Sequence, residues 1–308
     1  MATVLITGGT GLVGTQLTEE LLSKGYKVIV LTRKARQSNL SNLSYAVWDV
    51  EKGTVDAEAI GKADHIVHLV GAGVADKRWT AERKQEIVDS RTKSAALIVK
   101  ALKEVPNQVK TVVSASAIGW YGPDTAESKR RGFREDEKAD SHFLGETCRL
   151  WEESISPVKD LGKRLVKFRI GIVLSEKGGA LKEFMKPIRF GTAAILSKGS
   201  QVISWIHVED LCGMFIYAIE HEQMNGVYNA VAPHPVTNKE LTLQLAQNLR
   251  GKFYIPVHVP AFALKLALGE MSVEVLKSAT VSNEKIKGEG FTYLYPTIDS
   301  VLKKRAVN

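Results

Sequence analysis

The sequence has little cysteine and no long apolar run. Cys148 and Cys212 are the only cysteines among the 308 residues, and they lie far apart in the chain. A disulfide framework and a cysteine-based zinc site are therefore not supported. No stretch of about 18 apolar residues occurs, so no transmembrane helix is expected. Residues 1–9 lack a basic region and begin a strand pattern at once, which argues against a secretory signal and favours a cytoplasmic protein.

Several catalytic motifs are also missing. The chain has no His-Glu-x-x-His zinc motif, no Gly-Lys-Ser/Thr phosphate loop and no Gly-x-Ser-x-Gly nucleophile turn. His65 and His68 would lie on opposite faces of a strand, so they cannot bind one metal ion together. We therefore expect no metal site.

Positive charge exceeds negative charge, because 42 Lys and Arg against 34 Asp and Glu give a formal charge of +8. The excess is mostly dispersed along the sequence, with tight basic runs only at residues 129–131 and 303–305. A solvated surface explains both runs better than a nucleic-acid patch does. We expect a small-molecule substrate as the partner, and neither nucleic acid nor a membrane.

Short apolar runs alternate with longer helical patterns in the first half of the chain. This alternation is typical of an α/β protein whose parallel sheet is covered on both faces. The predicted strands are residues 4–7, 27–32, 44–48, 63–70 and 110–116, and the predicted helices are 11–23 and 80–104. Farther along, the patterns predict a helix at 140–155, one buried strand at 164–174, a helix at 208–220 and a strand at 226–229. Residues 119–140, rich in charge and glycine, predict an exposed loop.

The most informative stretch is residues 4–14, Val-Leu-Ile-Thr-Gly-Gly-Thr-Gly-Leu-Val-Gly, where a buried strand leads through glycines into a helix. Gly8 permits the tight turn, Gly11 lets the backbone approach a pyrophosphate, and Gly14 lets the helix pack close to the strand. The helix N-terminus offers free N–H groups to the diphosphate. We therefore predict a dinucleotide site here, and its residues are Gly8, Thr10, Gly11, Leu12, Val13 and Gly14.

The end of the second strand should select the cofactor. NAD enzymes usually place Asp or Glu there, whereas this chain has Thr32, Arg33 and Lys34. A guanidinium can bind a 2′-phosphate that a carboxylate would repel, so NADP is favoured. Two roles are open for Asp49, which follows the third strand. It could accept a hydrogen bond from the adenine amino group, or it could cap the following turn.

The Gly8, Gly11 and Gly14 spacing resembles the extended short-chain dehydrogenase/reductases, in the NAD-dependent epimerase/dehydratase branch. Several segments resemble one atypical group within it, the bacterial epimerase family proteins with a C-terminal domain of unknown function. These segments are Ser-Ala-Ser-Ala-Ile-Gly-Trp-Tyr-Gly at 114–122, residues 169–174, Gly-Gly-Ala-Leu at 178–181, Ser-Trp-Ile-His at 204–207, and residues 232–238 and 290–293.

The resemblance implies a Rossmann-type, doubly wound NADP-binding core with a small C-terminal α/β substrate or cap region. We place residues 1–175 mainly in the core, with returns to the sheet around 200–230, and residues 176–308 mainly in the cap region, including a small domain at about 255–305. A homodimer is expected by analogy. The resemblance also implies cofactor contacts beyond the glycine loop, at Thr32, Arg33, Leu69, Val70, Gly71, Glu86, Arg91 and Arg169. From the residues alone, Glu86 and Arg91 would be surface residues of a helix.

The usual acid–base pair of this superfamily is missing. It consists of a Tyr and a Lys four residues later, one helical turn away. None of the eight tyrosines in the sequence is followed by Lys at that spacing. Where the family position falls, Phe143 replaces the Tyr and Thr147 replaces the Lys.

Two residues are the candidates for catalysis. Ser116, after the fifth strand, sits where the superfamily has its substrate-polarising hydroxyl, although satisfying the strand end is an equally open role. Tyr121 is the nearest replacement proton donor, and without a lysine partner its pKa should stay near 10.

Two hypotheses follow. The first is an NADP-dependent oxidoreductase or epimerase acting on a small carbonyl compound or a sugar nucleotide. The second is an NADP-binding sensor or scaffold that has lost catalysis.

Overall fold

The computed structural model describes residues 1–307, together with the side chains of residues 1–303. Within this range, one eight-stranded sheet has the order β13-β7-β6-β5-β1-β2-β3-β4. All neighbours in it are parallel except β3 and β4. Its strands are β1 (Thr3–Thr7), β2 (Lys27–Thr32), β3 (Leu43–Asp49), β4 (Thr54–Val55), β5 (His65–His68), β6 (Thr111–Ala117), β7 (Arg164–Ile170) and β13 (Gly226–Ala230). The predicted α/β class with a mostly parallel sheet is confirmed.

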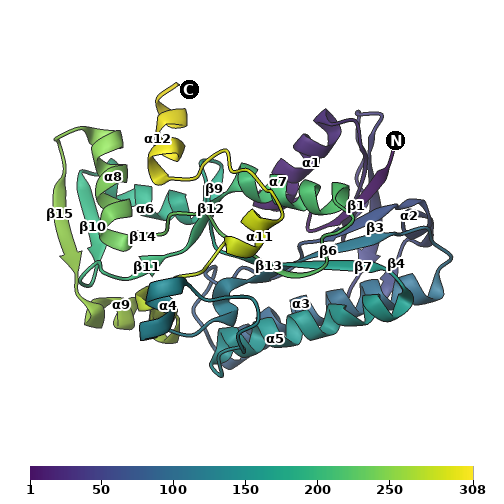
Figure 1. Ribbon diagram of the computed structural model, residues 1–308, viewed down its shortest axis with the longest axis horizontal. Helices are drawn as coiled ribbons and strands as arrows, with labels where there is room; N and C mark the ends of the chain where they lie inside the picture. Colours follow the sequence, from purple (N-terminus) through teal and green to yellow (C-terminus); the bar gives the residue numbers. More distant parts are fainter. Residues whose placement is uncertain (308) are drawn as a thin grey trace.

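Helices cover both faces of this sheet (Figure 1). On one face, α1 (Leu12–Ser23), α7 (Val208–Glu220) and α11 (Glu284–Gly288) contribute apolar side chains such as Leu17, Phe215 and Ile286 to one core cluster. On the other face, α2 (Ala57–Lys62), α3 (Ala81–Glu104) and α5 (Phe143–Ile155) bury Ile60, Ile98 and other side chains in a second cluster. The sheet is thus buried on both sides, as its continuous Val, Ile and Leu runs predict.

A second region follows β7. Its elements are β8 (Ile172–Ser175), β9 (Gly178–Gly179), α6 (Ala180–Arg189), β10 (Thr192–Leu196), β11 (Val202–Ile203), β12 (Trp205–His207), β14 (Val236–Thr237), α8 (Asn238–Arg250), β15 (Ile255–Val259), α9 (Ala261–Leu268), the 3-10 helix η3 (Gly269–Met271), α10 (Ser272–Leu276) and α12 (Ile298–Val307). They form small sheets of order β12-β8-β9, β10-β15 and β11-β14. The domain limits proposed from the sequence stay a prediction.

The single strand predicted at residues 164–174 is wrong. The chain leaves the large sheet at Gly171, so β7 belongs to that sheet whereas β8 pairs with β12. A side chain at Gly171 would place its Cβ 2.7 Å from the carbonyl oxygen of Ser204. The close approach of two backbones therefore requires glycine here. The bend is not visible in the sequence, because apolar residues continue on both sides of Gly171.

The exposed loop predicted at residues 119–140 is also wrong. This segment contains the 3-10 helix η1 (Ile118–Trp120) and helix α4 (Ala126–Arg131). Tyr121 and Phe133 are buried in it, and their rings stack with centroids 5.0 Å apart. The charges lie on the outer side of a packed segment, which composition alone does not reveal.

Candidate functional site

The glycine turn between β1 and α1 has the geometry that its sequence predicts. Gly8 has a φ of +70°. A Cβ at Gly14 would lie 2.3 Å from the carbonyl oxygen of Gly8 and 2.5 Å from the Cα of Gly9. At Gly11 a Cβ would meet only the oxygen of Gly8, at 3.3 Å. The helix therefore packs directly on the turn at Gly14, whereas Gly11 is exposed.

The first turn of α1 is open to an anion. Its N-cap residue is Gly11, and no side chain caps the helix N-terminus. Thr10 beside it is exposed. Leu12 packs against the β8–β9 hairpin, with its Cδ1 3.6 Å from the Cβ position of Gly178. The free N–H groups and the helix dipole suit a phosphate here, so these residues fit the diphosphate of a dinucleotide.

The turn lies where the strand order reverses. The first helical crossover leads from β1 to β2 on one side, while β5 pairs with β1 on the other side. A Cβ at Gly8 would lie 3.1 Å from the carbonyl carbon of Leu69, so the segments after β1 and β5 are in contact. In open α/β sheets, ligands bind in the crevice at such a switch point. Leu69 and Val70 lie beside Gly8 at this point.

Arg91 supports the segment after β5, and it is not the surface residue that its helical position predicts. Its side chain is buried, and its Nη1 donates hydrogen bonds to the carbonyl oxygens of Ala72 (3.1 Å) and Ile87 (2.9 Å). Its guanidinium carbon also lies 4.9 Å from the centre of the Trp151 ring. Glu86, in contrast, is an exposed side chain that accepts a hydrogen bond of 2.6 Å from Arg83. Cofactor contacts at Glu86 and Arg91 stay a prediction.

The end of β2 presents a cation. Thr32 is buried, and its hydroxyl donates to the carbonyl oxygen of Lys34 at 2.7 Å, which shapes the turn. Arg33 and Lys34 are both exposed. Asp49 accepts hydrogen bonds of 3.0 Å from the N–H groups of both Glu51 and Lys52. Asp49 therefore caps the turn after β3, and the hydrogen bond from Lys52 is the main reason why its pKa is lowered.

Sequence reasoning missed a buried hydrogen-bond chain beneath the glycine turn. The Thr7 hydroxyl lies 2.8 Å from Nδ1 of His68 and accepts a hydrogen bond from the N–H of Leu69 at 3.1 Å. Nε2 of His68 lies 3.3 Å from the Ser94 hydroxyl. Burial lowers the pKa of His68 to about 4, so this histidine is neutral. These hydrogen bonds join β1, β5 and α3 behind the glycine turn. In the sequence, their only sign is a histidine at the end of a buried strand.

Ser116 and Arg169 lie in a second buried network, around Glu152 of α5. The Ser116 hydroxyl donates to Oε1 of Glu152 at 2.9 Å, and Nε of Arg169 donates to the same oxygen at 2.8 Å. Nζ of Lys167 lies 3.4 Å from Oε2 of Glu152. The Arg169 guanidinium also stacks over Trp120, with its central carbon 3.6 Å from the ring centre. Ser116, Glu152 and Arg169 are each at most 4% exposed.

Tyr121 belongs to the same network. Its hydroxyl donates to Oδ1 of Asn229 at 2.7 Å and accepts from Nη1 of Arg169 at 3.0 Å. Burial raises its pKa to about 12, so the expected value near 10 is wrong. The hydroxyls of Ser116 and Tyr121 are both buried and bonded within the protein. The arrangement gives no support to either as a proton donor.

Phe143 and Thr147 occupy the first turns of α5, one turn apart. The Thr147 hydroxyl donates to the carbonyl oxygen of Phe143 at 2.6 Å. The Phe143 ring packs edge-on against Trp79, with centroids 4.9 Å apart. At these two positions the helix therefore offers an aromatic ring and a hydroxyl that is already bonded to its own backbone.

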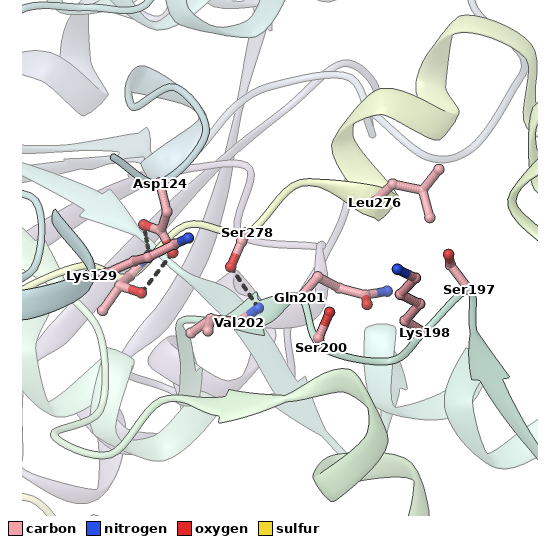
Figure 2. Close-up of a pocket in the computed structure, with 10 residues that line it drawn as sticks. Asp124, Lys129, Ser197, Lys198, Ser200, Gln201, Val202, Leu276 and Ser278 are labelled. Carbon is pink, nitrogen blue, oxygen red and sulfur yellow. Dashed lines mark hydrogen bonds between the residues drawn. The ribbon is translucent and has the colours of Figure 1, made fainter. Parts of the chain in front are cut away.

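A pocket of about 620 Å³ opens beyond the C-terminal end of β6. It is bounded by the segment around α4, the turn between β10 and β11, and the segment after α10 (Figure 2). In that view Lys129 and Lys198 lie at opposite ends, with Ser278 between them. The side chain of Asp124 is engaged, because it accepts from the N–H (2.7 Å) and the hydroxyl (2.8 Å) of Thr280. The lining therefore contains two lysines, one aspartate and several hydroxyls.

Comparisons with known proteins agree with this geometry. The NAD dependent epimerase/dehydratase family model matches residues 4–143, and a domain of unknown function matches residues 259–304. The epimerase family protein YfhF of Bacillus subtilis is 33% identical over 98% of this chain and 97% of its own length. An epimerase family protein of Mycobacterium leprae is 30% identical over 98% of this chain and 94% of its own.

The chain belongs to the NAD-dependent epimerase/dehydratase family. Among solved structures, the human epimerase family protein SDR39U1 with NADPH matches with a TM-score of 0.87 and 27% identity, over 99% of both chains. A nucleoside-diphosphate sugar epimerase of Corynebacterium glutamicum matches with a TM-score of 0.76 and 30% identity, over 98% of this chain and 57% of that one. The resemblance stated from the sequence motifs is confirmed, down to the branch with the C-terminal domain of unknown function.

In residues 1–307, no helix is long and apolar enough to span a membrane. The same residues contain no group of three or more His, Cys, Asp or Glu side chains placed to hold a metal ion.

Proposed function

We propose that this epimerase-family protein binds NADP(H) across the β1–α1 turn and uses it to oxidise or reduce a small anionic substrate. The observation that carries the proposal is the uncapped N-terminus of α1, which lies at the strand-order switch point beside the exposed Gly11. When bound, NADPH supplies a hydride. The N–H of Gly11 donates to the carbonyl oxygen of Gly8 at 3.0 Å, so the chain would hold the diphosphate on the N–H groups of residues 12–14 and border the rest of the cofactor with Leu69, Val70 and Gly71.

Arg33 supports a preference for NADP over NAD. It is exposed at the end of β2 and makes no ion pair with any side chain that the structure describes. A guanidinium in this position is suited to two hydrogen bonds with a 2′-phosphate. The human relative was solved with NADPH, whereas a more distant structural neighbour was solved with UDP-glucuronic acid and NAD.

The pocket beyond β6 is our candidate for the substrate site. Lys129 and Lys198 would attract phosphate or carboxylate groups, and the hydroxyls of Ser197, Ser200 and Ser278 would contact polar groups. A nucleotide-linked sugar has both kinds of group and is the substrate class that we favour. The proton would be exchanged with water or with a substrate group, because the hydroxyls of Ser116 and Tyr121 are engaged elsewhere.

The test of cofactor binding is a titration with NADPH and with NADH, followed by tryptophan fluorescence. We expect NADPH to bind at least tenfold more tightly, and Arg33→Asp to abolish that preference. Arg36→Asp, which removes an exposed charge from the same loop, is the matched control and should keep it. If neither nucleotide binds, or if Arg33→Asp leaves the preference intact, the proposed site is wrong.

A second candidate function is an NADP(H)-binding sensor without catalysis. Phe143 at the position of the usual Tyr, and the buried hydroxyls of Ser116 and Tyr121, favour it. Turnover with any member of a panel of carbonyl compounds and sugar nucleotides would rule it out. Tight NADPH binding without turnover, together with an NADPH-dependent change in partner binding, would support it. In the enzyme, Lys198→Ala should raise KM more than it lowers kcat, whereas Lys182→Ala, which removes an exposed side chain of α6, should change neither.

A further inference from the structure

The end of the molecule far from β1 carries an apolar edge. Figure 1 shows β15 as the outermost element at the left, with α9 at its lower end. Six large apolar side chains there are exposed, with exposed fractions from 43% for Val257 to 89% for Phe190. We define the apolar edge as Phe190, Phe253, Ile255, Val257, Phe262 and Leu266.

Backbone contacts join much of this edge into one surface. The N–H of Ile255 donates to the carbonyl oxygen of Gly191 at 2.8 Å, which brings Phe190 beside β15. Val257 is level with Ala194 in the β10–β15 ladder. Phe262 and Leu266 are four residues apart and so lie on one face of α9, which follows β15 after a single proline. Ile255, Val257, Phe262 and Leu266 are therefore held by β15 and α9, whereas Phe190 follows the end of α6 and Phe253 lies in the turn before β15.

Positive charge surrounds the apolar edge. Residues 184–208 and 241–269, which form most of this end, contain no Asp or Glu. They contain six Lys and Arg side chains, all of them exposed. This basic rim is Lys186, Arg189, Lys198, Arg250, Lys252 and Lys265. The excess charge that looks dispersed along the sequence is thus gathered by the fold.

A second copy of this chain does not fit the surface. Two copies would bring two basic rims together, in which only Lys186 has an acidic partner, Glu183 at 2.7 Å, and like charges repel. Pairing through the free edge of β15 is also hindered. Hydrogen bonds of Ile255 and Val259 run toward β10, so the alternating Pro256 faces outward, where it offers no N–H. Nucleic acid fits less well, because the aliphatic side chains of Ile255, Val257 and Leu266 neither stack on bases nor gain from a phosphate backbone.

We propose that the apolar edge and its basic rim dock this protein on an anionic membrane surface. Exposed Phe, Ile and Leu side chains with a surrounding layer of Lys and Arg are the features by which proteins bind in the plane of such a surface. The expectation that no membrane is a partner rested on the absence of a spanning segment. That absence excludes crossing the bilayer but not lying on it.

The test is sedimentation of the full chain with lipid vesicles. We expect binding to vesicles of 70% phosphatidylcholine and 30% phosphatidylglycerol, at least tenfold weaker binding to pure phosphatidylcholine, and a steep loss with added salt. Phe253→Ser with Phe262→Ser should reduce binding at least tenfold. Lys252→Glu with Lys265→Glu should do the same. The matched controls, Leu294→Ser for an exposed apolar residue and Lys159→Glu for an exposed basic one, should retain binding.

Thermal unfolding and NADPH titration of each variant separate this proposal from the proposed function. Because the apolar edge is remote from the glycine turn, neither the unfolding temperature nor the NADPH affinity should change. Absence of vesicle binding by the wild-type chain would overturn the proposal. So would binding that the double phenylalanine variant retains, since charge alone would then explain it. A dimer in solution that the same variant dissociates, without vesicle binding, would assign the edge to a second copy instead.

Discussion

The first turn of α1 and the end of β6 lie on the same edge of one parallel sheet, yet their polar groups differ in what they already bind. At α1 the helix N-terminus has no side-chain cap. At β6 the hydroxyl of Ser116 and, just beyond it, that of Tyr121 are bonded to Glu152 and Asn229. A ligand can use only the donors that the protein has not paired. The contrast therefore supports the proposal that a ligand binds at the glycine turn and that the buried network is structural.

The largest effect should come from the carboxylate of that network. Glu152→Ala leaves the buried cations of Arg169 and Lys167 without their partner, which should reduce the free energy of unfolding by about 3–5 kcal/mol. Glu153→Ala, its exposed neighbour paired with Arg149, is the control and should cost less than about 1 kcal/mol. Urea denaturation measures both. Equal small losses would mean that the network is not structural.

Substitutions at Gly14 and Gly11 should separate the packing role of the glycine turn from its role in ligand binding. Gly14→Ala forces a Cβ into the backbone of Gly8 and Gly9 and should destabilise the fold by about 3 kcal/mol. Gly11→Ala meets only one oxygen at 3.3 Å, so its stability should change by less than about 1 kcal/mol while NADPH affinity falls. Denaturation and nucleotide titration of both variants check this. If Gly11→Ala binds NADPH as tightly as the wild type, the proposed cofactor site at the glycine turn is wrong.

The buried histidine behind the turn predicts a pH dependence. His68 has a pKa of about 4 when folded and about 6.5 when unfolded, so between these values the unfolded chain binds more protons. The stability that neutral His68 contributes is complete above pH 6.5 and is lost as the pH falls toward 4. The loss should be roughly 2–3 kcal/mol. Comparing denaturation of wild type and His68→Asn across this range isolates it, and parallel pH profiles would contradict the assignment.

The smallest effect should come from Tyr121. Tyr121→Phe removes the hydroxyl that donates to Asn229 and accepts from Arg169. This loss should reduce the free energy of unfolding by about 1–2 kcal/mol. Once a substrate is identified, kcat should be nearly unchanged, because the buried Tyr121 hydroxyl is already bonded to Asn229 and Arg169. A loss of kcat of a hundredfold or more in a folded variant would return Tyr121 to the active site.

Much of the fold follows from local sequence patterns, because the strand runs and the glycine spacing report local geometry. Gly8 and Gly14 are predicted in both position and reason, since each is fixed by neighbours within a few residues. The bend at Gly171 is not predictable in this way, because the carbonyl that excludes a side chain there belongs to Ser204 on another strand.

The buried network has the same limitation. A glutamate in an amphipathic helix such as α5 is ordinarily a surface residue, and only the arrival of Arg169 and Lys167 from β7 makes Glu152 a core residue. Likewise, Tyr121 is buried because Asn229 reaches it from β13, more than a hundred residues later. Residue type and spacing therefore identify the glycine turn, whereas they cannot distinguish a catalytic hydroxyl from a structural one.

Hydrogen–deuterium exchange with and without NADPH tests the central contrast most directly. We expect NADPH to slow exchange of the backbone N–H groups in residues 8–14 and in the segment after β5, and to leave unchanged the rate in residues 116–122, which lie outside the proposed cofactor site. Protection confined to residues 116–122, with no change at the glycine turn, would contradict it.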